Sequence, residues 1–169
     1  MEDIKNFTFK LDSAGSISDI FELVKDAVWK TKNTGRAGLS LGLADLSVGW
    51  DSWIGAFHQI GSNLIVMNKA PIRGIYASDL DLYKPYVFTV LLHEYIHSLG
   101  YVDEALTRTI VYDICRELFG EEHVSTRMSL DMGHFFPKLT YGPEDYQLEE
   151  TIKIELIRDF DRSSTEYIM

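Results

Sequence analysis

The sequence predicts an α+β fold, and three patterns along its 169 residues lead to this prediction. Apolar residues recur at helical spacing near the N-terminus, short apolar stretches are cut by glycines between residues 38 and 68, and a long apolar helix pattern follows residue 85. The composition, 46% hydrophobic and 25% charged, is that of a globular chain with a sizeable core. Because no internal repeat or long Pro/Gly/Ser linker divides the chain, we expect one domain over residues 1–169.

The charge balance and the cysteine content exclude several classes of protein. The chain carries 16 Lys and Arg against 26 Asp and Glu, so its formal net charge is -10. Such a surface repels phosphate backbones, and we expect no nucleic-acid partner. The one cysteine, Cys115, excludes a disulfide framework and fits a reducing compartment. With no secretory signal and no apolar run approaching ~20 residues, we predict a cytoplasmic protein without a membrane partner.

The first part of the chain predicts a strand followed by a helix. Residues 6–11 alternate in polarity and predict the strand. Ser16 is a candidate N-cap with Asp19 at the third helical position, and Asn33 begins the polar stretch that ends the helix. The apolar stripe of this helix consists of Ile17, Ile20, Phe21, Val24, Ala27 and Val28.

The second part predicts a mixed, twisted sheet. Between residues 38 and 68, short apolar stretches separated by glycines predict strands joined by tight turns. Residues 63–68 give the clearest strand pattern, and residues 71–81 are predicted to form a loop. The glycines expected at the turns are Gly42, Gly49, Gly55 and Gly61.

Two helices and an irregular C-terminal part follow. Pro85 is placed for the first turn of a long helix, which ends at Gly100. Asp103 is a candidate N-cap of the next helix, and Gly120 closes that helix. Within the irregular part, residues 151–157 alternate in polarity and predict a last strand.

The helix before Gly100 carries residues with the spacing of a metal site. His93 and His97 are four residues apart, so both imidazoles can face one cation. Zinc binds such nitrogens at about 2.0–2.1 Å and keeps one coordination position open for water in catalytic sites. Glu94 lies about 100° around the helix from His93, where it reaches that water without binding the metal. This is the HExxH arrangement of two ligands and a general base.

The helical wheel separates these three residues from ordinary packing residues. His93, Glu94 and His97 lie off the core stripe, although the helix is otherwise apolar and expected to be mostly buried. A buried polar face needs partners, and a metal ion would supply them, so we predict one Zn²⁺ per chain. The core stripe consists of Phe88, Leu91, Leu92, Tyr95, Ile96 and Leu99.

The stretch from His93 to Asp103 resembles HExxHxxGxx(H/D), the signature of the metzincin clan of zincin metallopeptidases. In that clan the glycine breaks the active-site helix and a third ligand follows, and Gly100 and Asp103 stand at those two places. The resemblance implies a zincin-like domain with an upper part of about residues 1–100 and a lower part of about residues 101–169. It also implies that residues 63–68 form an edge strand that binds an extended substrate.

The third zinc ligand stays open between several residues. The resemblance implies Asp103, but capping of the following helix also explains an aspartate there. Glu117 lies on the following helix, which the short link after Gly100 would carry past the metal as an antiparallel partner. The alternatives to Asp103 are Glu104, Glu117 and His123. Candidates for the methionine turn of the clan are Met128 and Met132.

The sequence therefore predicts a zinc metallopeptidase, a hydrolase acting on a peptide or protein substrate. Zinc would lower the pKa of its bound water toward about 7, and Glu94 would take the water's proton and pass it to the leaving amine. Two alternatives keep the metal. One is the bacterial rRNA-maturation endoribonuclease family, whose HxxxHxxGYxH motif Gly100 and Tyr101 echo, although that family has glycine in place of Glu94. The other is a catalytically latent zinc-binding module.

Overall fold

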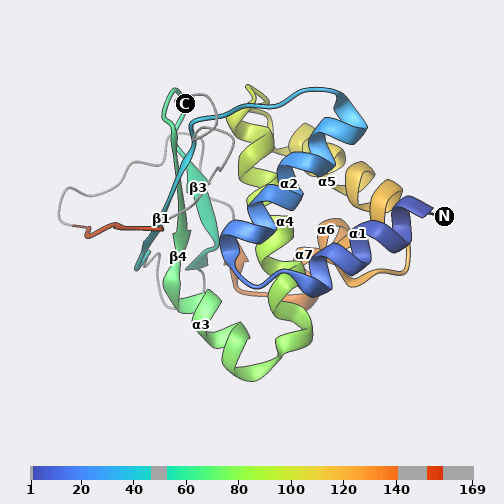
Figure 1. The fold of residues 1–169 in the computed structure, drawn as a ribbon. Helices are drawn as coiled ribbons and strands as arrows, with labels where there is room; N and C mark the ends of the chain where they lie inside the picture. The colour runs from blue at the N-terminus through green and yellow to red at the C-terminus, as the bar shows by residue number, and fades with distance from the viewer. Residues whose placement is uncertain (1, 47–52, 141–151, 158–169) are drawn as a thin grey trace.

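The computed structural model describes residues 2–46, 53–140 and 152–157, and it shows a layer of helices packed on one face of a small sheet (Figure 1). The mixture of helices and strands confirms the predicted α+β class. The helices are α1 (Glu2–Ser13), α2 (Ile17–Lys32), α3 (Lys69–Ser78), α4 (Leu80–Ser98), α5 (Glu104–Phe119), α6 (Val124–Leu130) and α7 (Met132–Phe135). The strands are β1 (Ser40–Ala44), β2 (Trp53–Ile54), β3 (Ala56–His58), β4 (Leu64–Asn68), β5 (Leu139–Thr140) and β6 (Glu155–Leu156).

The main sheet is mixed, as predicted, and its strand order is β3-β4-β1-β6. β1 and β4 run parallel, whereas β3 runs antiparallel to β4 and β6 antiparallel to β1. β2 and β5 form a separate parallel pair. Residues 63–68 supply a strand as predicted, but the expectation that they form the edge was wrong. β4 lies inside the sheet because β3 covers the side of β4 that faces away from β1.

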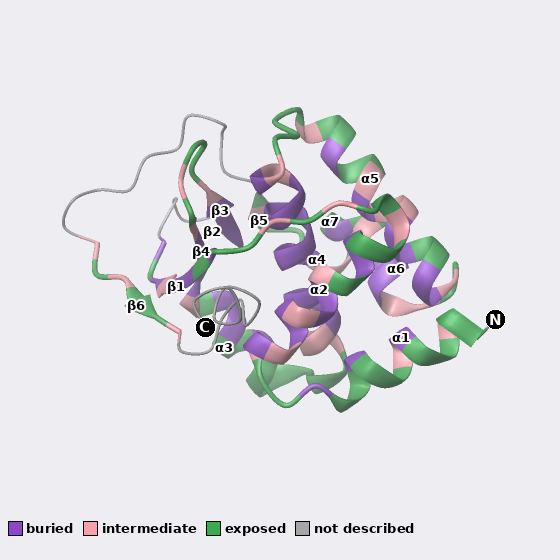
Figure 2. Cartoon of the chain, turned by 45° about the horizontal axis from the view of Figure 1, so that its top comes forward, coloured by how far each residue is buried: buried purple, intermediate pink, exposed green. Residues whose placement is uncertain are grey.

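α4 is the central helix of the layer and is buried on nearly all sides (Figure 2). It packs on α2, α3, α5, α6 and β3, so the polar residues in its second half are buried against protein, except His97, which is partly exposed. The helix begins at Leu80 and not near Pro85, because Asp79 caps it by accepting the N–H of Asp81. Neither α4 nor any other described helix is long and apolar enough to span a membrane.

α2 forms where the sequence predicted it, since its end signals are local. The Ser16 hydroxyl accepts the backbone N–H of Asp19 at 3.0 Å. Asn33 ends the helix with a φ of 53°, in the left-handed region, and donates its N–H to the Trp29 carbonyl. The apolar stripe of α2 is buried against α4.

Residues 6–11 form the middle of α1, so the predicted first strand is wrong. Phe7 and Leu11 are buried one helical turn apart, while Phe9 between them is exposed. The Phe7 ring packs edge-on against Phe119 of α5, with centroids 6.3 Å apart. Apolar residues four positions apart fit a helix, and the alternating polarity of the same segment fits a strand equally well. The contact with α5 selects the helix.

Residues 71–81 form most of α3 and the start of α4, so the predicted loop is also wrong. Pro71 is the third residue of α3, where a missing N–H leaves no helical hydrogen bond unmade. Pro71, Ile72 and Ile75 are the buried residues of this helix, and α3 packs on α4. A proline in a first turn is compatible with a helix, and burial of its neighbours stabilises this one.

The C-terminal part is more helical than the sequence predicted. α5 begins and ends as expected, with Asp103 accepting the N–H of Leu106 and Gly120 at its C-cap. The chain then forms α6 and α7 before the short strands β5 and β6. β6 lies within the predicted strand 151–157, which is confirmed for residues 155–156. Of the glycines expected at turns, Gly42 lies inside β1, so that expectation was wrong. Gly49 and residue 151 lie outside the described residues.

Candidate metal centre

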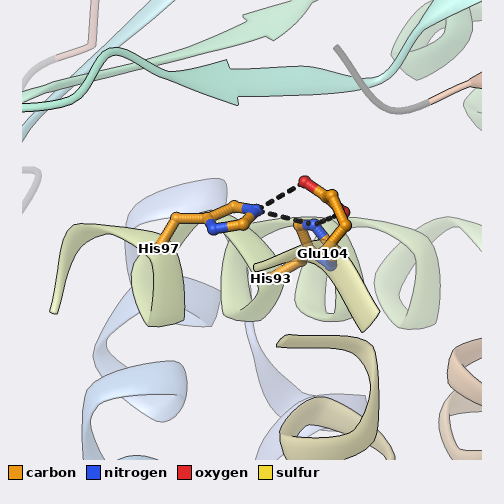
Figure 3. A group of neighbouring side chains, drawn as sticks. All are labelled: His93, His97 and Glu104. Carbon is orange, nitrogen blue, oxygen red and sulfur yellow. Dashed lines mark hydrogen bonds and ion pairs between the residues drawn. The ribbon is translucent and has the colours of Figure 1, made fainter. Parts of the chain in front are cut away.

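Two histidines on the last turns of α4 point their rings at the same place. The Nε2 atoms of His93 and His97 lie 3.1 Å apart, and His93 is only 2% exposed. Both rings lie on the side of α4 that faces the strands (Figure 3). The spacing of four residues therefore produces the shared face that the sequence predicted.

A carboxylate from the next helix completes the group. Gly100 adopts a φ of 107°, which favours glycine, and the chain turns there so that α5 packs beside α4. Glu104, the first residue of α5, places Oε1 2.7 Å from Nε2 of His97 and Oε2 3.0 Å from Nε2 of His93. His93, His97 and Glu104 form the one group of this kind, able to hold a metal ion, in the part of the chain that the structure describes.

The structure brings Glu104, and not Asp103, to the two histidines. The Asp103 carboxylate folds onto its own helix, where Oδ2 accepts the backbone N–H of Leu106 at 2.9 Å. An N-cap side chain is held in this way by the first turn, whereas the next side chain is not. Glu104 is therefore free to reach across to α4, and it replaces Asp103 as the candidate third ligand.

The three donor atoms fit a divalent metal ion in spacing and in chemistry. Metal–ligand bonds of about 2.0–2.1 Å in a tetrahedral zinc site place neighbouring donor atoms about 3.3 Å apart. The contacts within the group, at 2.7, 3.0 and 3.1 Å, are slightly shorter. Two imidazoles and one carboxylate are also a donor set of catalytic sites that leave a fourth position open. The group can therefore hold a metal ion after a small outward movement of the side chains.

The hydrogen bonds and opposite charges within the group shift the pKa values of His97 and Glu104 so that both side chains are charged. Burial lowers the pKa of His97, but the hydrogen bond with Glu104, the charge of Glu94 and the hydrogen bond to the Tyr101 carbonyl outweigh it and raise this pKa to about 9. Burial raises the pKa of Glu104, but the hydrogen bonds from His93 and His97 outweigh it and lower this pKa to about 2. The metal-free group thus holds a proton on the His97 imidazole, and a metal ion has to replace it.

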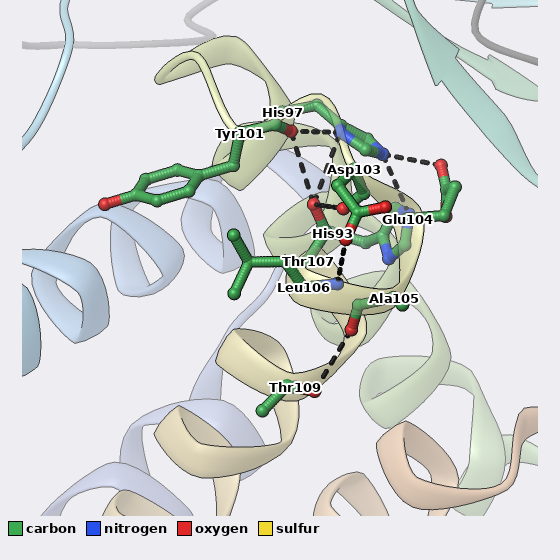
Figure 4. Close-up of polar contacts among 9 residues, drawn as sticks. All are labelled: His93, His97, Tyr101, Asp103, Glu104, Ala105, Leu106, Thr107 and Thr109. Atoms are coloured by element: carbon green, nitrogen blue, oxygen red, sulfur yellow. Dashed lines mark hydrogen bonds and ion pairs between the residues drawn. The ribbon is translucent and has the colours of Figure 1, made fainter.

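A backbone carbonyl orients the His97 ring from behind. Nδ1 of His97 lies 2.6 Å from the Tyr101 carbonyl oxygen (Figure 4). A carbonyl only accepts, so Nδ1 carries the proton that it donates to this oxygen. In the neutral ring, Nε2 then presents its lone pair to His93 and Glu104, which is the orientation that a metal ligand needs.

The predicted general base lies beside the group. Glu94 is 4% exposed, and burial is the largest cause that raises its pKa. The charges of His93 and His97 and a hydrogen bond from the backbone N–H of His58 lower this pKa in part, and the charge of Glu104 raises it. A buried carboxylate with a raised pKa is suited to accept and return a proton near neutral pH.

β3 also brings a histidine that the sequence did not connect with the site. The pairing of Ala56 with Met67 and of His58 with Ile65 places these residues on the face of the sheet that packs against the helices. Nε2 of His58 donates to the Ser62 carbonyl at 2.8 Å. Burial and the charges of Arg36 and His97 lower the pKa of His58, and the bond to Ser62 offsets them in part. The alternation of side chains along β3 is the sequence signal that could have placed His58 on the side of the sheet that faces the helices.

The remaining candidates from the sequence lie elsewhere. Glu117 is exposed on α5. Nδ1 of His123 accepts the N–H of Ser125 at the start of α6, and its ring stacks on Phe119. Met128 lies inside α6 and Met132 is the first residue of α7. None of these residues belongs to the group of His93, His97 and Glu104.

Comparison with known proteins assigns no family to the chain. A scan against protein-family models, a search of curated proteins and a search of solved structures each found no match. The function is therefore inferred from the residues of the site and their geometry.

Proposed function

We propose that the chain is a zinc-dependent peptidase in which His93, His97 and Glu104 are the zinc ligands and Glu94 is the general base. One observation carries the proposal. Two imidazole nitrogens and a carboxylate oxygen converge within 4.8 Å of one another, and a buried glutamate lies beside them. The HExxH spacing and the resemblance to zincins support the same roles. In this proposal Glu104 takes the place that the sequence left open.

The three ligands would bind the zinc ion, and the neighbouring Glu94 carboxylate would transfer the proton. Zinc favours two imidazoles and a carboxylate, and when bound it would act as a Lewis acid and lower the pKa of water at the open position. Glu94 would accept the proton of that water and return it to the leaving amine. The backbone N–H of His58 holds the Glu94 carboxylate in place, and burial keeps it a strong enough base for this transfer.

The edge of β3 supports an extended peptide as the substrate. β3 pairs with β4 on one side, and no described strand pairs with its other side. The backbone N–H of His58 forms a hydrogen bond with Glu94, and β3 packs on α4. A peptide that added to β3 as a further strand would therefore pass beside the zinc ligands. The favoured substrate class is an unfolded or extended segment of protein.

The test is cleavage of a peptide mixture by the zinc-loaded protein and by the Glu94→Gln variant, read by mass spectrometry, with the zinc content of both proteins determined. We expect about one zinc per chain in both proteins and a loss of cleavage of at least about 10²–10⁴-fold in the variant. Glu117→Gln is the matched control, since it makes the same change at an exposed position of α5. It should retain full activity.

Two results would contradict the proposal. Cleavage by Glu94→Gln at the wild-type rate would exclude Glu94 as the base. A wild type that binds zinc but cleaves no peptide would exclude the peptidase and leave the latent zinc-binding module. His97→Ala, which removes a ligand, should lose the zinc, so metal content separates the site from the reaction.

A further inference from the structure

We propose that Thr107 is a positioning residue for the metal centre, because its hydroxyl holds the Tyr101 carbonyl where that oxygen accepts the Nδ1–H of His97. The inference rests on the metal site of the proposed function and not on the reaction. Thr107 contacts neither the metal position nor Glu104 in any described interaction, and it would act through His97 alone.

The Thr107 hydroxyl contacts three residues at the turn between α4 and α5 (Figure 4). Its Oγ1 lies 2.8 Å from the Asp103 carbonyl oxygen, 3.2 Å from the Tyr101 carbonyl oxygen and 3.5 Å from Nδ1 of His97. The residue is 0% exposed, so water does not compete for these contacts. One hydroxyl proton serves the two carbonyls, while the oxygen lone pairs face the Nδ1–H of His97.

The Tyr101 carbonyl needs such an anchor because of where it lies. It belongs to the short link between Gly100 and Asp103, which has no helical hydrogen bonds, and the Tyr101 side chain is exposed. Its oxygen decides which nitrogen of His97 carries the proton. If the carbonyl moved away, the proton would be free to reside on Nε2, where it would block the metal position.

A simpler explanation is that the Thr107 hydroxyl only stabilises the helix α5. A second threonine of the same helix provides a control for this explanation. Thr109, on the same helix, also donates to a carbonyl four residues back, with its Oγ1 3.0 Å from the Ala105 oxygen. Thr109 is exposed and lies away from the turn (Figure 4). If Thr107 only stabilised α5, its loss would lower the stability of the protein without a specific effect on metal binding.

The experiment compares the wild type with Thr107→Val, Thr107→Ser and Thr109→Val. Zinc affinity is measured by competition with a chelator, and unfolding of the metal-free proteins is measured in parallel. Loss of a group that supports a metal ligand costs about 10–100-fold in affinity, so we expect about a tenfold weaker zinc affinity for Thr107→Val. Thr107→Ser, which keeps the hydroxyl, should restore the affinity, and Thr109→Val should not change it.

A nitrogen NMR spectrum of histidine-labelled, zinc-loaded wild type supplies a readout that does not depend on the variants folding. We expect His97 to bind zinc through Nε2 with a proton on Nδ1. Zinc bound through Nδ1 would overturn the inference, and so would a Thr107→Val protein that is destabilised but binds zinc as tightly as the wild type. In both cases the metal site of the proposed function would stand. A wild type that binds no zinc would overturn the site and this inference together.

Discussion

Zinc binding to the metal-free protein should release the proton that His97 holds. With a pKa of about 9, the His97 imidazole is almost fully protonated at pH 7, and a zinc ligand must be unprotonated. A higher pH removes the competing proton, so the affinity for zinc should rise with pH. The rise is about tenfold per pH unit well below the pKa and levels off near it, which amounts to about 25-fold between pH 7 and pH 8.5.

The same pKa gives the opposite trend for the stability of the metal-free protein. The pKa of His97 is raised above its ordinary value of 6.5 by the pairing with Glu104 and the charge of Glu94. A group of this kind contributes stability that is fully present below pH 6.5 and is lost as the pH rises through about 9. Between these values the metal-free protein should therefore become less stable while its zinc affinity increases.

Calorimetry of zinc binding at pH 7, in buffers with different enthalpies of ionisation, counts the released protons. We expect about one proton per zinc from His97 in the wild type. Glu94→Gln removes one of the charges that raise the His97 pKa and keeps all three candidate ligands, so in this variant the number of protons released per zinc should fall below one at a lower pH than in the wild type. Zinc binding without proton release, together with an affinity that stays constant from pH 7 to 8.5, would refute the pairing of His97 with Glu104.

Two further predictions concern the third ligand and the packing of the sheet. Glu104→Ala should weaken zinc binding by more than the loss of about 10–100-fold that follows removal of a group supporting a ligand. Asp103→Asn should not weaken zinc binding, since asparagine also caps helices. If a chelator competition showed the reverse order, Asp103 would be the third ligand. Gly42→Ala should destabilise the protein by about 1–3 kcal/mol in denaturant unfolding, because overpacking of this size is costly. The added Cβ would clash with Cγ2 of Ile154. The double variant with Ile154→Ala should recover most of that loss, and an undiminished loss would mean that this contact is not the cause.

The elements that the sequence predicted correctly are those whose signals are local. The N-cap at Ser16 and the left-handed Asn33 at the C-terminus of α2 depend only on neighbouring residues. α1 and α3 were missed because short apolar spacings fit more than one structure, and contacts with α5 and α4 select the helix. The edge position of β3 depends on strand order, which residues close in sequence do not determine.

The same distinction explains which site residues could be predicted. His93, Glu94 and His97 lie on one helix, so their relation follows from the helical repeat alone. Asp103 and Glu104 are adjacent carboxylates, and the sequence could not tell which one reaches the histidines. Their positions relative to α5 supply the reason, because the capping residue gives its carboxylate to the helix N–H groups and the residue after it does not. In this chain the capping role of Asp103 therefore makes Glu104 the better candidate for the metal.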